Sequence, residues 1–258
     1  MHANEGLIIL EYSVGSQLLA SLRSKLVQEL GYGTHATIDP IVKETLDEVL
    51  DTAEKIVKPR GMYRILPVLD TDAEGVLTRV GTIRSAMFAR LLGKCTGNPS
   101  IVFMVATLGN ELESRCGTQA PLYRQMVFDS AGSILVETVA DMVEADWRGR
   151  LNRLGFQYSL RLSPGYCDWA LDGQRLMAAS LNTEKVGIHL TSDFIMIPSK
   201  SISAIAATAR QVPIAAPCSF CKKSDCLSRR STDGLRCRHD TIGESISLGS
   251  TTPERKST

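Results

Sequence analysis

The sequence has no excess of charge of either sign. Its 29 lysine and arginine residues nearly balance 28 aspartate and glutamate residues over 258 positions. A uniformly basic surface, which would attract nucleic acid or acidic lipid, is therefore excluded. No apolar run reaches the ~18 residues of a membrane helix, and the first residues carry no basic leader or cleavage site. We expect a folded cytoplasmic protein that binds neither nucleic acid nor membrane.

Histidine is scarce, and the few histidines are dispersed. His2, His35, His189 and His239 are far apart, and none stands near an obvious nucleophile. The sequence therefore has no visible nucleophile–histidine pair of the kind that acyl-transfer enzymes use. The seven cysteines are an odd number, which together with the absence of a secretory leader favours thiols or metal ligands over a disulfide framework.

Apolar periodicity predicts a mixture of helices and strands. A helix over 40–57 is the best marked, because Asp39 is a candidate N-cap and Pro40 fits the first helical position. By the same signals we expect helices over 16–30, 85–92, 122–151 and 171–182, and strands within 62–80, 100–109, 156–163, 186–190 and 194–207, the last interrupted by Pro198.

The segment "FQYSLRLSPGY" combines a strand pattern with a turn. Regular alternation puts Phe156, Tyr158, Leu160 and Leu162 on one face and Arg161 on the other. Proline and glycine then make a turn in which a ligand can approach the backbone closely. An arginine beside it can bind a carboxylate, and the Tyr166 ring can cover a cation or an adenine. On spacing alone, an ordinary Pro-Gly turn with a solvated arginine is the alternative.

Five segments in order resemble the activation (reactivation) domain of cobalamin-dependent methionine synthase. They are "LGYG" from Leu30, "TLG" from Thr107, "DSAGSILVE" from Asp129, "RLSPGY" from Arg161 and "LTSDFIMIPSKSIS" from Leu190. Each is a modest match, but five in the same order make coincidence improbable. The resemblance implies a single α+β domain over residues 1–212, with a central, largely antiparallel twisted sheet flanked by helices.

The resemblance also implies a binding site for S-adenosylmethionine. The residues that contact the ligand in that family correspond here to Arg161, Ser163, Gly165 and Tyr166, together with the helix residue Glu137. Arginine suits the methionine carboxylate, glutamate the amino group, and the backbone near the glycine the adenine. Helical periodicity alone places Glu137 on a solvated face with Asp141 and Glu144.

By resemblance, the reaction is methyl transfer from S-adenosylmethionine to the cobalt of a cobalamin or other corrinoid during reductive reactivation. Such a transfer needs orientation of the reactants but no general base. The corrinoid would be held by a partner, either a split methionine synthase or another corrinoid methyltransferase, and electrons would come from a donor such as a flavodoxin or ferredoxin. The chain departs from the family pattern at "CDWALDG" and "AIAATA". A non-catalytic metal-binding accessory or sensor protein that uses the same cleft for a related ligand is the alternative.

A cysteine-rich stretch follows the expected domain. Over 213–240 the sequence places Cys218, Cys221, Cys226 and Cys237 close together, with His239 beside them. Four such ligands can hold zinc or an iron–sulfur cluster, although the spacing is neither a ferredoxin pattern nor a paired zinc ribbon. Free or redox-active thiols remain the alternative. The polar composition of 241–258 predicts a disordered tail.

Overall fold

A six-stranded antiparallel sheet lies at the centre of the structure, a computed structural model that describes residues 6–32, 37–117, 120–213 and 254–257. The strand order is β11-β1-β2-β6-β10-β7, and every neighbouring pair is antiparallel. The strands are β1 Ile8–Glu11, β2 Arg60–Pro67, β6 Ser100–Thr107, β7 Gln157–Tyr158, β10 Ser201–Ala209 and β11 Glu254–Ser257. Strands and helices are mixed along the chain, which confirms the predicted α+β class.

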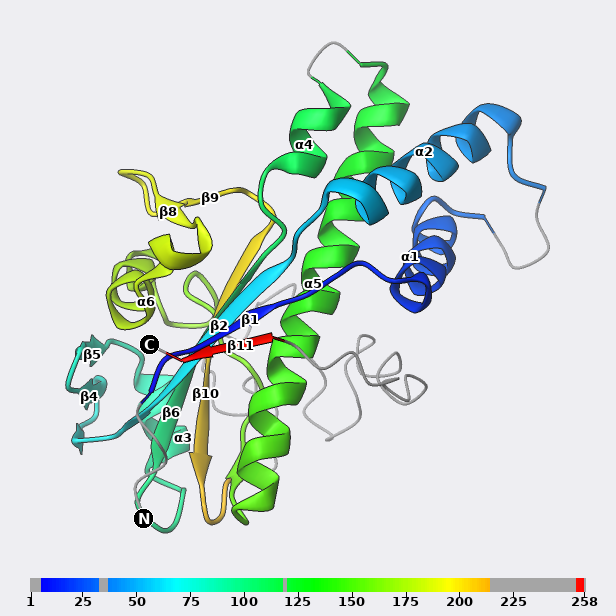
Figure 1. The fold of residues 1–258 in the computed structure, drawn as a ribbon. Coiled ribbons are helices and arrows are strands. Elements are labelled where there is room, and N and C mark those ends of the chain that lie inside the picture. The colour runs from blue at the N-terminus through cyan, green and yellow to red at the C-terminus, as the bar shows by residue number, and fades with distance from the viewer. Residues whose placement is uncertain (1–5, 33–36, 118–119, 214–253, 258) are drawn as a thin grey trace.

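Two small sheets and several helices complete the fold (Figure 1). The small sheets comprise β3 Asp70–Thr71, β4 Val76–Thr78 and β5 Gly81–Ile83, and β8 His189–Leu190 with β9 Met196–Ile197. The α-helices are α1 Ser16–Glu29, α2 Pro40–Ile56, α3 Ala86–Leu92, α4 Glu111–Cys116, α5 Leu122–Arg153 and α6 Gln174–Leu181, and two 3₁₀ turns are η1 Leu171–Gly173 and η2 Thr183–Val186. In the part of the chain that the structure describes, no helix has the length and apolarity needed to cross a membrane.

The predicted helix starts are confirmed by their caps. The Asp39 carboxylate accepts a hydrogen bond from the Ile41 N–H at 2.8 Å, and Pro40 is the first residue of α2. At α3, the Ser85 hydroxyl accepts from the Phe88 N–H at 3.0 Å. In both helices a polar side chain satisfies a backbone donor that has no partner within the helix.

The last strand departs from the prediction of a disordered tail. Residues Glu254–Ser257 form β11, which pairs with β1, so the prediction for 241–258 is wrong for these four positions. Its other positions, 241–253 and 258, lie outside the described residues. Without β11, β1 would be an edge strand, and the open backbone groups of an edge strand pair with another strand largely regardless of its side chains.

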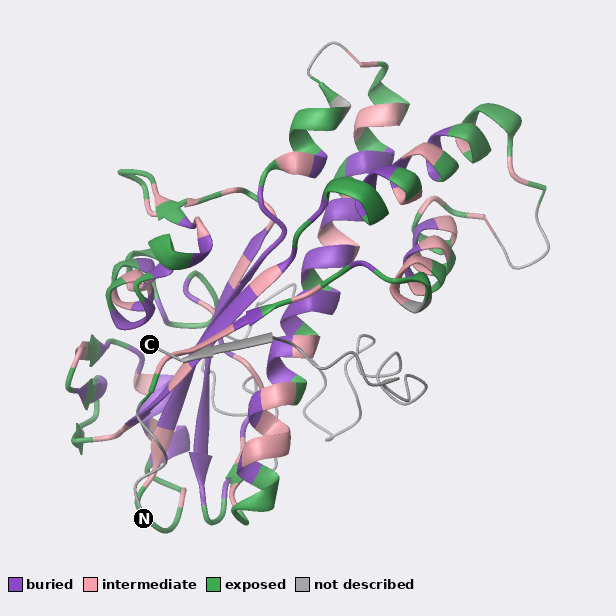
Figure 2. Cartoon of the chain, in the orientation of Figure 1, coloured by how far each residue is buried: buried purple, intermediate pink, exposed green. Residues whose placement is uncertain are grey.

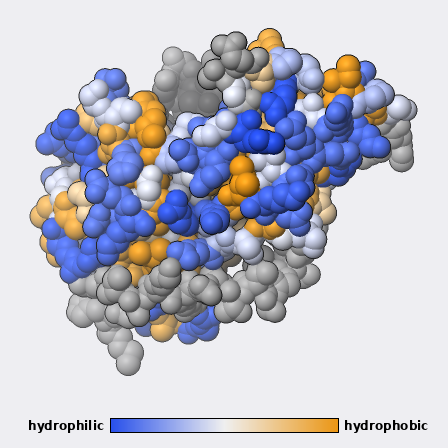
Figure 3. Space-filling view, turned by 45° about the horizontal axis from the view of Figure 1, so that its top comes forward, coloured by the Kyte–Doolittle hydropathy of each residue, from blue (hydrophilic) through white to orange (hydrophobic). Residues whose placement is uncertain are grey.

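The sheet separates two apolar cores. One face packs against α1, α2 and α5, through residues such as Tyr63, Met104 and Ala206. The other face packs against α3 and α6, through residues such as Met62 and Phe103. Figure 2 shows the resulting pattern, with buried strands between helices whose outer sides are exposed. The surface seen in Figure 3 is mainly hydrophilic, with separate apolar patches.

Helix α5 is the element that presents the site, and it lies close against the sheet. Gly61 on β2 permits this approach, because a Cβ there would stand 2.2 Å from the Cγ2 atom of Val143. Further along α5, Trp147 is fully buried and its indole N–H points to the Met104 sulfur at 3.5 Å. The Trp147 and Tyr158 rings meet edge to face, with centroids 5.3 Å apart.

A buried tyrosine also links β2 to α5 and makes the stability of the fold depend on alkaline pH. The Tyr63 hydroxyl donates to Asp146 at 2.6 Å, and burial, followed by that hydrogen bond and the carboxylate charge, raises the Tyr63 pKa from 10.0 to about 12. Unfolded tyrosine loses its proton first, so this contribution is complete below pH 10 and lost as the pH rises toward 12.

Replacing Tyr63 with phenylalanine should therefore flatten the alkaline stability profile. We expect the free energy of unfolding of the wild type to fall between pH 10 and 12, with ~2 kcal/mol of that fall assignable to Tyr63. Urea denaturation at several pH values, for wild type and Tyr63→Phe, measures the difference in slope. Parallel profiles for the two proteins would show that Tyr63 is not responsible.

Candidate functional site

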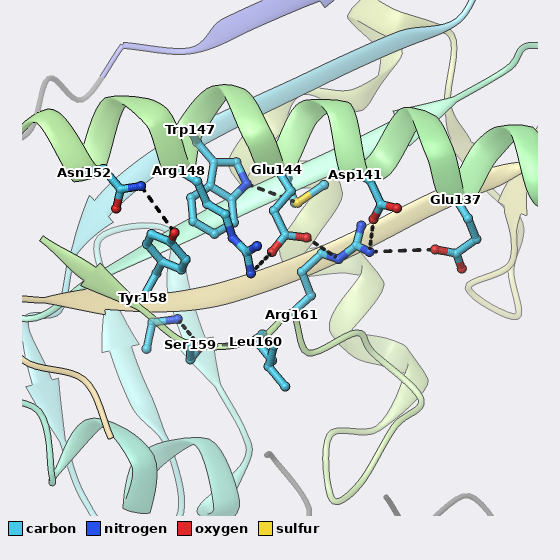
Figure 4. Close-up of polar contacts among 12 residues, drawn as sticks. Glu137, Asp141, Glu144, Trp147, Arg148, Asn152, Tyr158, Ser159, Leu160 and Arg161 are labelled. Atoms are coloured by element: carbon cyan, nitrogen blue, oxygen red, sulfur yellow. Dashed lines mark hydrogen bonds and ion pairs between the residues drawn. The ribbon is translucent and has the colours of Figure 1, made fainter. Parts of the chain in front are cut away.

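Three acidic residues of α5 and one arginine form the candidate site. Glu137, Asp141 and Glu144 follow one another on one side of the helix, and Arg161 reaches across to all three (Figure 4). The Arg161 Nε atom lies 2.8 Å from Glu144 Oε2, while its Nη2 atom lies 2.7 Å from Asp141 Oδ1 and 3.8 Å from Glu137 Oε2. The structure thus brings together the two charged residues that the resemblance paired, Arg161 and Glu137.

The three carboxylates differ in their exposure. The Glu137 and Asp141 side chains are each 63% exposed, whereas the Glu144 side chain is 9% exposed. The prediction of one solvated acidic face is therefore wrong for Glu144, which is buried and paired with Arg161 and Arg148. An acidic residue at helical spacing carries no sign of such pairing, because the partner arginine comes from a distant part of the chain.

A β-bulge turns Arg161 toward α5. Tyr158 is opposite Thr208 and Leu162 is opposite Ile205, so residues 159–161 stand opposite only residues 206 and 207 of β10. An extra residue of this kind reverses the side to which the following residues point. Inside the bulge, Ser159 keeps the pairing with β10, because its N–H donates to the Ala207 carbonyl and its hydroxyl accepts from the Ala207 N–H, both at 2.9 Å.

The bulge corrects the prediction of regular alternation over 156–163. Tyr158 packs in the core on the α5 side of the sheet, whereas Leu162 packs in the core on the opposite side. The two residues therefore do not share a face, although regular alternation requires it. Arg161 consequently lies on the same side of the sheet as Tyr158, close to the acidic residues of α5.

The turn after Arg161 is tightly bonded within itself. Gly165 has φ +90°, a conformation that residues with a Cβ rarely adopt. Its N–H donates to the Trp169 carbonyl at 2.8 Å, and the Tyr166 N–H donates to the Ser163 carbonyl at 3.2 Å. Ser163 is half-buried, and Tyr166 is 64% exposed. The turn therefore presents an aromatic ring to solvent, and two of its N–H groups are already bonded inside the loop.

Asp168 anchors this turn to the second core. Its carboxylate accepts from the Ser85 hydroxyl at 2.5 Å and from the Met87 N–H at 2.7 Å, at the start of α3. The neighbouring Trp169 is buried at 3% exposure. The segment "CDWALDG", which departs from the family pattern, thus fixes the turn in place. An ordinary solvated Pro-Gly turn would need no such anchor.

Three of the other matched segments, "TLG", "DSAGSILVE" and "LTSDFIMIPSKSIS", meet one another and have a structural role. Lys200 Nζ contacts Asp129 Oδ1 at 2.6 Å and the Ser133 hydroxyl at 3.1 Å, joining "IPSKSIS" to "DSAGSILVE". The Ser201 hydroxyl donates to Thr107 Oγ1 at 2.8 Å, joining it to "TLG". These contacts fix α5 against the ends of β6 and β10, and so set where Glu137 stands.

The predicted metal site lies outside the described residues. Cys218, Cys221, Cys226, Cys237 and His239 all fall within 214–253, where the structure describes no residue. Among the residues that it does describe, no cluster of three or more His, Cys, Asp or Glu side chains is arranged to hold a metal ion.

A hollow of about 380 Å³ lies away from the acidic residues. It is lined by Gly6, Leu7, Arg64, Lys185 and the end of α6, and it contains none of the predicted site residues. The charged residues that line this hollow, Arg64 and Lys185, are both cationic. We therefore place the candidate site at Arg161, which pairs with carboxylates and directly precedes the rigid turn.

The fold is similar to that of a known reactivation domain. No protein-family model matches the chain, and no curated protein matches it either. A solved structure does: the crystal structure of the MetH reactivation domain bound to AdoHcy (S-adenosylhomocysteine) matches with a TM-score of 0.58 and 17% sequence identity. The match covers 82% of this chain and 81% of that one. This similarity confirms the predicted fold and is consistent with the sequence resemblance on which that prediction was based.

Proposed function

We propose that this protein binds S-adenosylmethionine at Arg161, beside the exposed carboxylates of α5. The observation that carries the proposal is one guanidinium with two exposed carboxylates beside its Nη2 atom. An amino acid moiety carries the complementary pair of charges, so its carboxylate would meet Arg161 and its ammonium group would meet Glu137 or Asp141. The AdoHcy bound to the structurally similar domain has such a moiety.

Ligand entry would exchange one ion pair for another. In the structure the Asp141 carboxylate pairs with Nη2 of Arg161 at 2.7 Å. Asp141 is exposed, so moving it costs little burial, and a displaced Asp141 becomes available to the ligand's ammonium group. The remaining parts of the site would hold the nucleoside: Tyr166 offers an exposed ring for stacking on adenine, and the fixed turn at Ser163 and Gly165 limits how the ligand lies.

The reaction we propose is support of corrinoid reactivation in trans. A methyl group would pass from the sulfonium to the cobalt of a cobalamin or related corrinoid on a partner methyltransferase, leaving AdoHcy. A flavodoxin or ferredoxin would supply the reducing electron. The residues of this chain would orient the donor and exclude water, since the transfer needs no general base.

The cysteines at 218, 221, 226 and 237 would hold zinc or an iron–sulfur cluster, which metal analysis of wild type and Cys221→Ser tests directly.

Calorimetric titration of S-adenosylmethionine into the full chain tests the proposed function. We expect saturable binding to the wild type and unchanged binding to Arg153→Ala, a control that removes an exposed arginine from the end of the same helix. Failure of the wild type to bind would overturn the proposal. Transfer of a labelled methyl group to cob(I)alamin, with and without a corrinoid protein, then separates catalysis from sensing.

A further inference from the structure

Glu144 bridges two arginines at the back of the candidate site. Its Oε1 atom lies 2.6 Å from Arg148 Nη2, and its Oε2 atom lies 2.8 Å from Arg161 Nε. The side chain is 9% exposed. A carboxylate removed from water to this extent is stable only with good partners, and here both oxygens have a guanidinium donor. Glu144 also neutralises charge between two cations that would otherwise repel each other.

The second arginine, Arg148, packs against two aromatic rings. The Arg148 guanidinium lies over the Tyr158 ring at 4.7 Å and over the Trp147 ring at 5.8 Å. Trp147 is fully buried and meets Tyr158 edge to face. A continuous series of contacts therefore runs from the core through Arg148 and Glu144 to Arg161, as Figure 4 displays.

Two nitrogens of the Arg161 guanidinium have different neighbours. Nε meets the buried Glu144, whereas Nη2 meets the exposed Asp141 and Glu137. Only the second set can be displaced by a ligand at small cost, because exposed ion pairs contribute little. The buried pair would remain in place while the exposed pair exchanges.

We propose that Glu144 is a positioning residue for ligand binding: it holds Arg161 by Nε so that Nη2 faces the carboxylate of the incoming S-adenosylmethionine. Glu144 does not touch the ligand, and it acts through Arg161. This inference rests on the proposed function, and it adds a residue that the family resemblance does not assign. It also gives the β-bulge a purpose, because the bulge places Arg161 on the side where Glu144 lies.

A pair of ligands separates positioning from general damage. S-adenosylmethionine carries the carboxylate that Arg161 would bind, and decarboxylated S-adenosylmethionine lacks it. We expect Glu144→Gln to weaken binding of the first about tenfold and to leave binding of the second within about twofold of wild type, because only the first uses Arg161. Glu54→Gln, an exposed glutamate of α2, is the matched control and should leave both affinities unchanged.

The outcomes distinguish this inference from the proposed function. If wild type binds neither ligand, the proposed function fails. If wild type binds both and Glu144→Gln weakens them equally, or weakens neither, Glu144 does not position Arg161. Should Glu144→Gln fold poorly by circular dichroism, Glu144→Asp keeps the charge with a shorter reach, and a smaller loss confined to the carboxylated ligand is then expected. An equal loss for both ligands in Glu144→Asp would overturn the inference.

Discussion

Replacing Trp147 with alanine is expected to lower the free energy of unfolding by about 3–5 kcal/mol, the usual cost of removing a fully buried aromatic side chain. Trp147 has no exposed surface, and its neighbours are the edge of Tyr158 and the sulfur of Met104. The cavity would open between α5 and the sheet, beside Met104 of β6 and Tyr158 of β7. Neither side can close easily, because α5 already touches β2 at Gly61.

Tyr123→Ala provides the control for this prediction. Tyr123 is an aromatic residue of the same helix but is 42% exposed. We expect its removal to cost less than ~1 kcal/mol, since surface substitutions rarely cost more. Chemical denaturation of wild type and both variants measures the comparison. A loss for Trp147→Ala no greater than that for Tyr123→Ala would mean that α5 does not depend on this contact.

Elements with long periodic patterns or clear caps could be predicted from the sequence. Helices α2 and α5 have apolar residues on one side over many turns, and Asp39 marks where α2 begins. The missed elements are short or marked only by their partners. Strand β1 has four residues and helix α4 has six, so each repeats its apolar pattern too few times to be recognised. Strand β11 depends on pairing with β1, which no local pattern shows.

The candidate site was predictable in its residue types but not in its geometry. Resemblance selected Arg161 and Glu137, and the structure brings them within 3.8 Å of each other. The bulge was not predictable, because a sequence of alternating residues looks the same with or without an extra unpaired position. Glu144 was missed for a related reason: its burial results from a long-range ion pair with Arg161, and a helical pattern describes only neighbours along the helix.

The anchoring of the turn shows the same limit. Asp168 is an ordinary acidic residue in sequence, yet it accepts two hydrogen bonds at the start of α3, more than eighty positions away. The segment that departs from the family pattern therefore stabilises the turn. Local signals identified a turn with a proline and a glycine, whereas its rigidity comes from contacts that only the folded chain creates.

Replacing Arg161 with alanine is expected to weaken S-adenosylmethionine binding by ~tenfold to ~hundredfold, because hydrogen bonds between charged groups contribute about 1.5–3 kcal/mol. Arg161 is the guanidinium that faces the exposed carboxylates of Asp141 and Glu137, so its loss leaves the ligand's carboxylate beside like charges. The fold should survive, since Glu144 retains Arg148. Decarboxylated S-adenosylmethionine should bind with little change or more tightly, because it brings only positive charge to an acidic surface.

The lysine variant separates charge from geometry at the same position. Arg161→Lys keeps the positive charge but cannot hold Glu144 and a ligand carboxylate through two nitrogens of one planar group. If Arg161 acts by bridging, Arg161→Lys should lose most of the affinity that Arg161→Ala loses. If charge alone matters, the lysine variant should bind nearly as well as wild type. Titrations of both variants with both ligands decide between these readings, and equal affinity of Arg161→Ala and wild type would remove Arg161 from the site.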